Sequence, residues 1–564
     1  MTEVPRQSVD VVLSIPELVE LITTEVLEAT HTAEHPPEPK ETAMFLHAFY
    51  EGYYDIPYLT NDFRSMRLVC SSWNIALKGA TQFWNRIRFD HSSTLLFART
   101  VIRRSGDRPL WFYIGHENFC DITDTAFRTW LPAICIFVGQ HMHRTERIAI
   151  NLDHIHLEQC MHRLTVYNAP QLRYLYLKEP QSMIRDAVWK PLCEAEIFFG
   201  GNLRSFKFLL LDCVALKWNP LPVPTDKLTH LCILQDDNFA GPREKKEDLT
   251  NMILACPMLQ HFAFIAEGDS GIVRPYPFLS HPSLTSLTIS SLFFLFDLPK
   301  IPMSNLDLSQ TARALCDLHL HVELVCPGDL DSFFNVLANT PLLEKLTLEL
   351  TSHLNEDDVN GGPPFAHDVV QHRGSLAYLT DLQITSPNYA IFRVFGAFNM
   401  TLLSSAALLM RKGLRINNRG FYKVYLDHVW VSMEPLPMLT HLHIGMRLTR
   451  QDIDPLLSKC PSLQTLSIDK IGDKAQTCVL QALLKKDNGT YLAPHLWQLT
   501  LVVLGEADYL PPLLVAALRH NRSIKIVQAP SPYHRRTLRY TLRAADEVQS
   551  DESNSDFSDL DELS

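Results

Sequence analysis

The feature that most constrains the fold is a short motif that recurs through residues 170–502. An apolar residue is followed by two others, a second apolar residue, one more residue and a third apolar residue, often after a proline. PMLQHFAF (257–264), PLLEKLTL (341–348) and PSLQTLSI (461–468) are typical copies. The first apolar position falls at 172, 203, 228, 259, 284, 315, 343, 379, 439, 463 and 496. Self-similarity at a period of about 20–50 residues predicts a stacked array of structural units.

The spacing inside the motif predicts a strand in each copy. The last two apolar residues are two positions apart, so on a strand they share one face. Several copies follow an amphipathic stretch with an acidic first turn that ends at a proline, as in DLTNMILACP (248–257), DLDSFFNVLANTP (329–341) and QDIDPLLSKCP (451–461). These stretches predict helices that stop where proline prevents continuation. The gap between the copies at 379 and 439 predicts a degenerate copy at Phe421, Val424 and Leu426.

The motif resembles the LxxCPxLxxLxL pattern of the leucine-rich-repeat family over more than half of the chain. This resemblance implies an α/β solenoid over residues 145–530, with parallel strands on the concave side and helices or loops on the convex side. The family's usual Asn or Cys after the strand is absent here, which leaves the repeat count and the curvature open.

In such a solenoid, the residues on either side of the last two apolar positions face the concave side, where these proteins commonly bind their ligands. The copy at 201–208 places Ser205 and Lys207 on that face. The set is polar and mixed in charge, so a protein-binding surface is one interpretation and a merely solvated sheet face is the other. The residues that we predict to bind a target are Tyr174, Tyr176, His230, His261, Asp317, His319, His321, Lys345, His441 and His443.

Residues 11–90 lack the motif and show helical periodicity instead. IPELVELITTEVLEA (15–29) places apolar residues on one helix face, and FRSMRLVCSSWNIALKG (63–79) has apolar residues three or four apart. A third short piece, ATQFWNRIRF (80–89), ends the segment. We therefore expect a small all-α module that precedes the repeat array.

This module resembles the F-box in the order of its sequence features. Ile15-Pro16-Glu17-Leu18 comes first, then Leu68-Val69-Cys70-Ser71-Ser72-Trp73, and then Phe83-Trp84. An insertion at about 30–59 separates the first helix from the rest, and FARTVIRRSGDRPLWFYI (97–114) resembles the segment that follows the F-box in large fungal families. The resemblance implies a substrate receptor of a Skp–cullin–F-box ubiquitin ligase. The residues that it implies for binding of the Skp-type adaptor are Ile15, Pro16, Leu18, Leu21, Ile22, Leu68, Val69 and Trp73.

Charge and composition argue against several other classes of function. The net charge is −12, and residues 546–564 contain eight acidic residues and no Lys or Arg, so the chain lacks the basic balance of a phosphate-neutralising nucleic-acid binder. There is no CxxC pair, phosphate-binding glycine motif, leader segment or long apolar run. Gly268-Asp269-Ser270-Gly271 matches a serine-protease phrase without its histidine partner, and four His-x-His pairs do not complete a metal site. We expect no catalytic residues, metal, cofactor, nucleic acid or membrane.

The domain organisation that follows has a disordered start (1–10), the F-box-like module (11–90), a transitional segment (91–144), the solenoid (145–530), a basic segment (531–545) and a disordered acidic tail (546–564). The expected partners are a Skp-type adaptor, a cullin scaffold and an unknown protein target, with a monomer outside the complex, in the cytoplasm or nucleus. The alternative is a repeat scaffold whose N-terminal helices cap the solenoid, which requires Leu18, Val69 and Trp73 to be buried.

Overall fold

The structure is a computed structural model, and it describes the parts of the chain that carry the repeats. The described residues are 71–79, 81–89, 95–115, 124–179, 198–214, 225–236, 253–267, 281–291, 312–324, 327–352, 373–386, 394–410, 433–445, 450–469, 480–487, 490–503 and 525–530. The chain divides into two compact units, Met1–His321 and Val322–Ser564. The fold is mixed α/β, and its dominant element is a long sheet of parallel strands.

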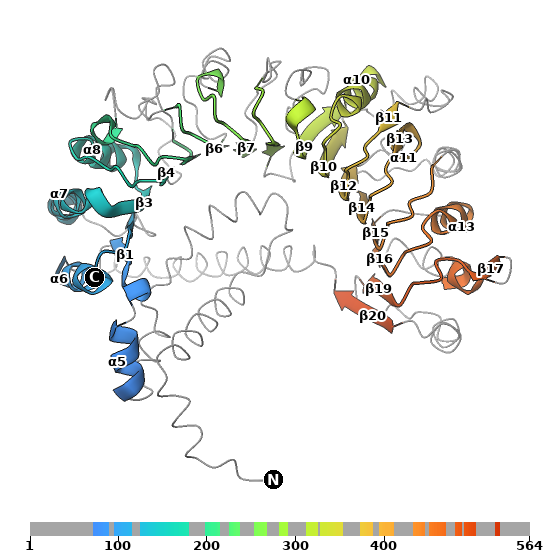
Figure 1. Cartoon of the computed structure of the whole chain (residues 1–564), viewed down its shortest axis with the longest axis horizontal. Coiled ribbons are helices and arrows are strands. Elements are labelled where there is room, and N and C mark those ends of the chain that lie inside the picture. The colour runs from blue at the N-terminus through green and yellow to red at the C-terminus, as the bar shows by residue number, and fades with distance from the viewer. Residues whose placement is uncertain are drawn as a thin grey trace, which may run out of the picture. The chain divides into compact units, whose positions relative to one another are not determined.

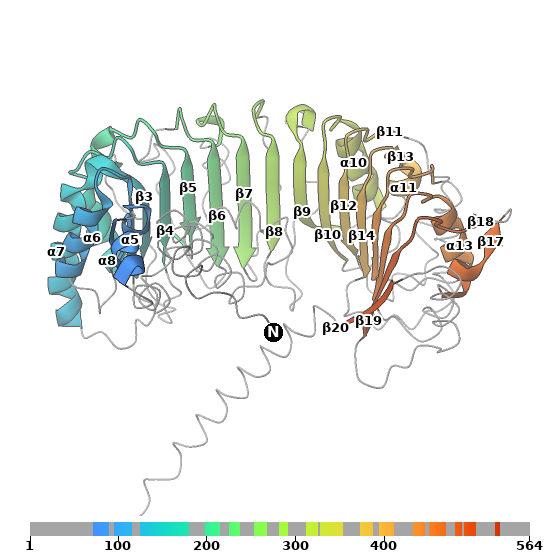
Figure 2. The same cartoon turned by 60° about the horizontal axis from the view of Figure 1, so that its bottom comes forward.

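In the first unit each strand of the sheet pairs in parallel with the next one along the chain (Figure 1; Figure 2). This order is what a stacked repeat array requires, because every repeat contacts only its neighbours. The strands are β1 (Arg86–Phe89), β2 (Leu110–Gly115), β3 (Thr145–Asn151), β4 (Tyr174–Lys178), β5 (Phe208–Asp212), β6 (His230–Asp236), β7 (His261–Glu267), β8 (Ser286–Ser291) and β9 (Asp317–Leu324).

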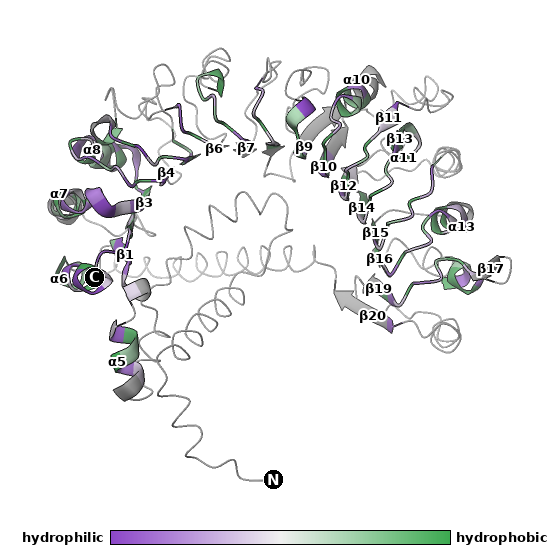
Figure 3. Ribbon diagram, in the orientation of Figure 1, coloured by the Kyte–Doolittle hydropathy of each residue, from purple (hydrophilic) through white to green (hydrophobic). Residues whose placement is uncertain are grey.

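Helices α6, α7 and α8 lie on one side of the first strands (Figure 1). In α8, the Asp153 carboxylate accepts a hydrogen bond from the His156 backbone N–H and caps the first turn. Apolar residues three and four apart are buried in α8, and polar residues share the helix with them (Figure 3). The helical elements of this unit are α5 (Ser71–Gly79), α6 (Leu95–Ser105), α7 (Asp124–Gln140), α8 (His154–Leu164), η1 (Thr81–Trp84), η3 (Met142–Arg144), η4 (Phe198–Gly201) and η6 (Ala312–Ala314).

The parallel sheet begins earlier in the chain than the recurring motif does. Within 80–89, where we expected a helical piece, a 3-10 turn at 81–84 leads into strand β1. Ile87 and Phe89 are buried while Arg86 and Arg88 are half-buried, and this two-residue alternation favours a strand over a helix. The sheet therefore extends back into the segment for which we expected an all-α module.

In the second unit a run of parallel strands follows the same plan, with each strand paired to the next one in the run. These strands are β10 (Lys345–Ser352), β12 (Asp381–Ser386), β14 (Ser405–Met410), β15 (His441–Gly445), β16 (Thr465–Asp469), β19 (Gln498–Val503) and β20 (Lys525–Pro530). Two small sheets pair β11 (Gly374–Ser375) with β13 (Phe398–Asn399) in parallel, and β17 (Lys486–Asp487) with β18 (Thr490–Tyr491) antiparallel. The helices are α10 (Pro327–Ala338), α11 (Val394–Ala397) and α13 (Arg450–Ser458).

The three apolar residues of each motif form the core of both units. Leu343, Leu346 and Leu348 are at most 1% exposed, and most of the corresponding described positions of the other copies are buried as well. In most motif copies the strand is entered through a pair of backbone N–H groups that share one carbonyl oxygen of the preceding repeat, as Thr440 and His441 share that of Ser404. Thus the motif predicts the core and the sheet correctly.

The structure corrects the register of two copies. The copy at 201–208 was wrongly placed, because strand β5 begins at Phe208 and pairs Phe208 with Tyr174. Ser205 and Lys207 therefore precede the strand. The copy missing between 379 and 439 lies at Leu403, Ala406 and Leu408, and not at the predicted position. All three residues are buried, and Ala406 and Leu408 belong to β14, which Leu403 precedes. Phe421, Val424 and Leu426 lie outside the described residues.

Candidate binding face

A row of planar side chains crosses the first seven strands of the first unit. One face of the sheet carries the residues that alternate with the buried leucines of the motif. We call it the ladder face, and the row lies on it. The pairing register places these side chains side by side. We call this row the stacked ladder, and its members are Arg86, Trp111, Arg147, Tyr174, Phe208, His230 and His261.

The ladder begins with two arginines that enclose a tryptophan. The Arg86 guanidinium lies 4.2 Å from the Trp111 ring centroid, and the Arg147 guanidinium lies 3.8 Å from the same ring. Arg147 also lies 4.2 Å from the ring centroid of Tyr174. Cation–π contacts of this kind stabilise by about 0.5–2 kcal/mol each, depending on how far they are removed from water.

The ladder continues as a column of stacked rings. Centroid distances are 4.2 Å from Tyr174 to Phe208, 4.1 Å from Phe208 to His230 and 4.1 Å from His230 to His261. These ring pairs are nearly parallel, with interplanar angles of 13–29°. The spacing follows from the sheet, because neighbouring strands lie about 4.8 Å apart and in-register planar side chains then stack face to face.

Trp111 and Arg173 are joined by an acidic side chain at the edge of the ladder. The Trp111 indole N–H donates to Glu146 Oε2 over 3.2 Å, and Arg173 Nη1 lies 3.4 Å from Glu146 Oε1. Glu146 therefore fixes the orientation of the tryptophan between its two arginines.

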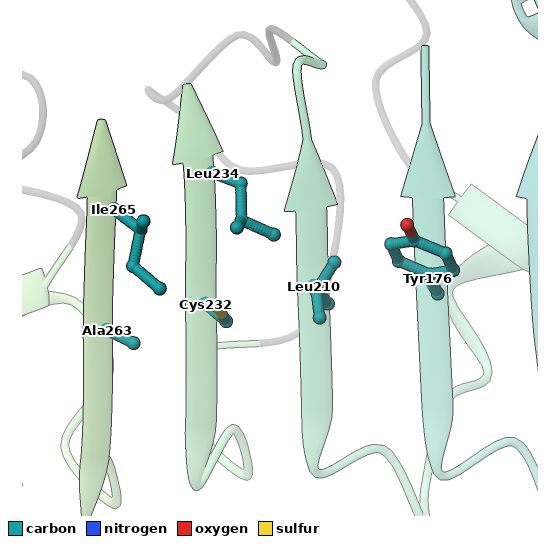
Figure 4. Close-up of a cluster of buried hydrophobic side chains, with 6 residues drawn as sticks. All are labelled: Tyr176, Leu210, Cys232, Leu234, Ala263 and Ile265. Atoms are coloured by element: carbon teal, nitrogen blue, oxygen red, sulfur yellow. The ribbon is translucent and has the colours of Figure 1, made fainter. Parts of the chain in front are cut away.

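A second row of the ladder face is apolar and buried. Tyr176, Leu210 and Cys232 are 5%, 2% and 0% exposed, although they alternate with the motif leucines and we predicted a polar face. Leu234, Ala263 and Ile265 of the neighbouring strands join them in one cluster (Figure 4). The prediction of a polar face was therefore wrong for this row of the first unit, because apolar residues stand both at and between the motif positions in β4–β7.

A buried carboxylate anchors this cluster. Asp212 is 7% exposed and accepts a hydrogen bond from the Tyr176 hydroxyl over 2.7 Å. Lys178 Nζ lies 2.8 Å from the same oxygen, Asp212 Oδ2. A buried charge is stable only with such partners, so Tyr176 is held in place by packing and by a charge-assisted bond.

The histidines of the ladder are held in the neutral form. Burial first, and then the nearby His261 and Lys207, lower the pKa of His230 to about 3, and burial lowers the pKa of His261. The Thr229 hydroxyl donates to the Lys207 carbonyl over 3.1 Å, so it accepts from His230 Nδ1, 2.8 Å away. This geometry assigns the proton of the neutral ring to Nδ1.

The predicted target-binding residues divide into four groups. Tyr174, His230 and His261 belong to the stacked ladder, and half-buried Asp317 occupies the same row of the sheet beyond Ser286. Tyr176 and His319 are buried at 5% and 3% exposure. His321 lies in β9 at the end of the first unit. The remaining three, on β10 and β15 of the second unit, are Lys345, His441 and His443.

On the second unit the corresponding rows are polar, as predicted. Lys345 and His443 are half-buried and His441 is exposed. The register aligns Lys345 with Asp381, and His441 with Ser405 and Thr465.

The arginines and Trp111 of the ladder were missed by the sequence analysis. They lie in β1–β3, where the motif is absent, so the motif could not reveal them. Their signal is an alternation in which Arg86 and Arg88, and then Trp111 and Tyr113, stand two positions apart beside apolar residues, and in which Arg147 precedes the apolar run IAI (148–150). Phe208 was missed because the copy at 201–208 was read out of register.

Among the eight residues predicted to bind an adaptor, the structure describes only Trp73. Trp73 lies on α5 and is 5% exposed, and Leu77 on the same helix is fully buried. The Trp84 indole N–H donates to the Leu77 carbonyl over 2.8 Å, which ties α5 to the turn before β1. The other seven residues, Ile15, Pro16, Leu18, Leu21, Ile22, Leu68 and Val69, lie outside the described residues.

Burial suppresses the ionisation of three cysteine thiols. Burial raises the pKa of Cys256 and of Cys460 to about 12 and raises that of Cys232 further, so these thiols are poor nucleophiles. In the described ranges no three His, Cys, Asp or Glu side chains are grouped to hold a metal ion. Gly268-Asp269-Ser270-Gly271 lies outside those ranges. No helix within them is long and apolar enough to cross a membrane.

Comparison with known proteins gives no relative by which to extend these findings. No protein-family model matches the chain, and no curated protein matches it.

Proposed function

We propose that the chain is a substrate-recognition subunit of a Skp–cullin–F-box ubiquitin ligase. The N-terminal helices bind the Skp-type adaptor, a leucine-rich-repeat solenoid binds a protein target, and the cullin scaffold joins the complex through the adaptor. The chain itself carries no catalytic residue or cofactor. It acts in the cytoplasm or nucleus by holding the target near the transfer machinery, which replaces a bimolecular encounter by a local one.

The stacked ladder is the observation that supports the proposed binding of a protein target. Its side chains are half-buried and immobilised by their neighbours, so a ligand that contacts them requires little further ordering of the surface. Arginine and aromatic side chains also dominate the residues that contribute most to protein interfaces. A rigid row across seven strands thus suits recognition of an extended partner.

The proposed binding of the adaptor rests on the succession of F-box-like sequence features from Ile15 to Trp73. Apolar residues at Leu18, Leu21 and Ile22 predict a helix face that a partner can bury. The structure adds that Leu77 and Trp84 are buried and that the Trp84 indole N–H donates to the Leu77 carbonyl, which joins α5 to the turn before β1. On this proposal the adaptor contacts the helices before α5, while Trp73 supports them from inside.

A second candidate is a repeat scaffold that engages no ubiquitin ligase. The burial of Trp73 and Leu77 favours it, because a helix that caps the start of an array buries its apolar residues within the chain. The two functions differ in whether Leu18 and Val69 are available to a partner.

Binding of a purified Skp-type adaptor separates the two candidates. Calorimetry on the full chain should show a complex, and a Leu18→Asp, Val69→Asp variant should lose it, because two charges enter an apolar interface. The matched control is Leu342→Asp, Met438→Asp, which places the same charges on two exposed apolar side chains of the second unit.

Retained circular dichroism in both variants, with binding lost only in the first, supports the receptor. A wild-type chain that does not bind the adaptor contradicts it and leaves the scaffold as the better account.

A further inference from the structure

Two cysteine side chains face each other between helices α7 and α8. Cys135 and Cys160 are both fully buried thiols, and the Cys135 thiol points at the Cys160 sulfur over 3.6 Å. A disulfide bond is about 2.05 Å long, so the sulfurs are in contact and must approach by roughly 1.5 Å to be joined. The two helices lie side by side on the outer side of the first strands (Figure 1). The pair is therefore placed for a covalent link between two neighbouring connections of the sheet.

The packing next to the pair brings the two connections close together. Gly139 stands one turn after Cys135 on α7, and the Tyr167 ring lies so near it that an added Cβ would be 2.2 Å from the ring. Because Gly139 has no side chain, the segment after α8 can close against α7 beside the sulfurs. The contacts of Cys135 with Cys160 and of Gly139 with Tyr167 are thus successive layers of one interface.

A proline in α7 weakens the helix near the pair. Pro132, three residues before Cys135, has no backbone N–H, so the helical hydrogen bond to the carbonyl of residue 128 is missing. A helix opens most easily at such a point, and brief local opening gives a small oxidant access to the sulfurs. Hydrogen peroxide is small and uncharged, so it needs a smaller opening than a peptide disulfide does.

The two helices enclose one strand of the ladder. The chain runs from α7 through η3 into β3 and from β3 into α8. Strand β3 carries Arg147, whose guanidinium lies 3.8 Å from the Trp111 ring centroid and 4.2 Å from that of Tyr174. A bond between Cys135 and Cys160 closes a loop that contains this whole strand. Such a loop reduces the conformational freedom of every state in which the two helices separate.

We propose that Cys135 and Cys160 are an oxidation site, at which hydrogen peroxide forms a disulfide that braces β3 and the ladder residue it carries. One thiol, ionised while the helices are apart, attacks a peroxide oxygen and breaks the O–O bond, which gives a sulfenic acid and a hydroxide that takes up the thiol proton. The second thiol attacks the sulfenic sulfur, and the oxygen leaves as water.

The two steps balance as one oxidation. Two thiols and one peroxide give one disulfide and two waters, so the sulfurs lose two electrons and the peroxide oxygens gain them. The site involves only α7 and α8, so the inference stands whether or not the chain binds a Skp-type adaptor.

Peptide mapping of the full chain tests the bond. The reduced chain is exposed to hydrogen peroxide without denaturant, and the remaining thiols are then alkylated in denaturant before digestion with trypsin. The peptides that carry Cys135 and Cys160 should be joined and two hydrogen atoms lighter than their sum, and dithiothreitol should separate them. Cys460 should be recovered as an alkylated thiol, because burial raises its pKa to about 12 and keeps it protonated.

Hydrogen exchange measures the bracing. Backbone amides within 145–151 should exchange at least about tenfold more slowly in the oxidised chain than in the reduced chain, and β14–β16 of the second unit should not change. Cys135→Ala should abolish the slowing. The matched control is Cys460→Ala, at another fully buried cysteine, and it should keep the slowing. If circular dichroism shows that Cys135→Ala does not fold, Cys160→Ala takes its place, and the wild-type peptide map needs no variant.

Three results would overturn the inference. Recovery of Cys135 and Cys160 as thiols, or as separate sulfinic or sulfonic acids, from the folded and peroxide-treated chain shows that no disulfide forms. Joined peptides that combine isotopically labelled and unlabelled chains assign the bond to two copies instead of one. A disulfide that forms within one chain but leaves exchange at 145–151 unchanged shows that it does not brace β3.

Discussion

At the scale of single residues, the neutral state of His230 makes the ring column possible. A protonated imidazole between Phe208 and His261 would be a charge removed from water beside a second histidine and near Lys207. The Thr229 hydroxyl provides the hydrogen bond that the neutral ring needs. The ladder is therefore most stable where both histidines are uncharged.

This state predicts a loss of stability in mild acid. The pKa of His230 is lowered to about 3 in the folded chain and is about 6.5 in the unfolded chain. Between pH 6.5 and pH 3, therefore, the imidazole is protonated in the unfolded state but stays neutral in the folded state. Stability from this group is complete above about pH 6.5 and falls with pH below it. His230→Phe keeps a stacked ring and removes the titration. Urea unfolding at pH 7 and pH 5 should show that the wild type loses about 1–2 kcal/mol more than the variant. Equal losses in the two chains would disprove this role for His230.

The sequence predicted only those ladder residues that lie inside a copy of the motif. Tyr174, His230 and His261 follow directly from LxxLxL, because every second position on a strand shares a face. Arg86 and Arg147 carry the same alternation but no leucine motif. Their stacking depends on the register of β1–β3, which is a long-range property that local periodicity does not specify.

At the scale of elements, the turn before β10 separates two adjacent leucines. Leu342 is 44% exposed and Leu343 is fully buried, although both precede the same strand. The Leu343 backbone N–H donates to the Thr340 carbonyl, which closes the turn and directs the second side chain into the core. The same arrangement recurs before β15, where Met438 is 53% exposed and Leu439 is buried.

These two neighbours predict opposite responses to the same substitution. Leu343→Ala should lower the free energy of unfolding by about 2–5 kcal/mol, because it removes buried methyl groups and leaves a cavity. Leu342→Ala should change it by no more than about 0.5 kcal/mol, as expected at an exposed position. Denaturant unfolding of the two variants measures both effects. A larger loss for Leu342→Ala would show that the repeat is placed in the wrong register here.

Elements with strong alternation were predicted correctly, and those without it were not. In FLLLD (208–212) apolar residues fill both faces of the strand, so the motif at 201–208 gave no unique register. In β14 an alanine, Ala406, stands where other copies have a larger apolar residue, which hid the repeat. In the structure, the buried residues define the register of β5 and of β14. Which residues are buried depends on the neighbouring strands, which the sequence of one copy does not specify.

At the scale of the whole molecule, the described parts of each unit repeat one plan, in which a turn leads into a strand that pairs in parallel with its neighbours. The two units differ in what their strands present. The first has the stacked ladder and a buried apolar cluster, and the second has polar rows around Lys345, His441 and His443. The proposed receptor thus has two chemically distinct faces for a partner.

The most direct test of the proposed receptor is hydrogen exchange on the full chain with and without a purified Skp-type adaptor. The account predicts slower exchange of backbone amides within residues 11–79 when the adaptor is present, and unchanged exchange in β4–β8 of the ladder face. Protection confined to those strands, or no protection anywhere, would contradict the division of the chain into an adaptor-binding module and a target-binding sheet.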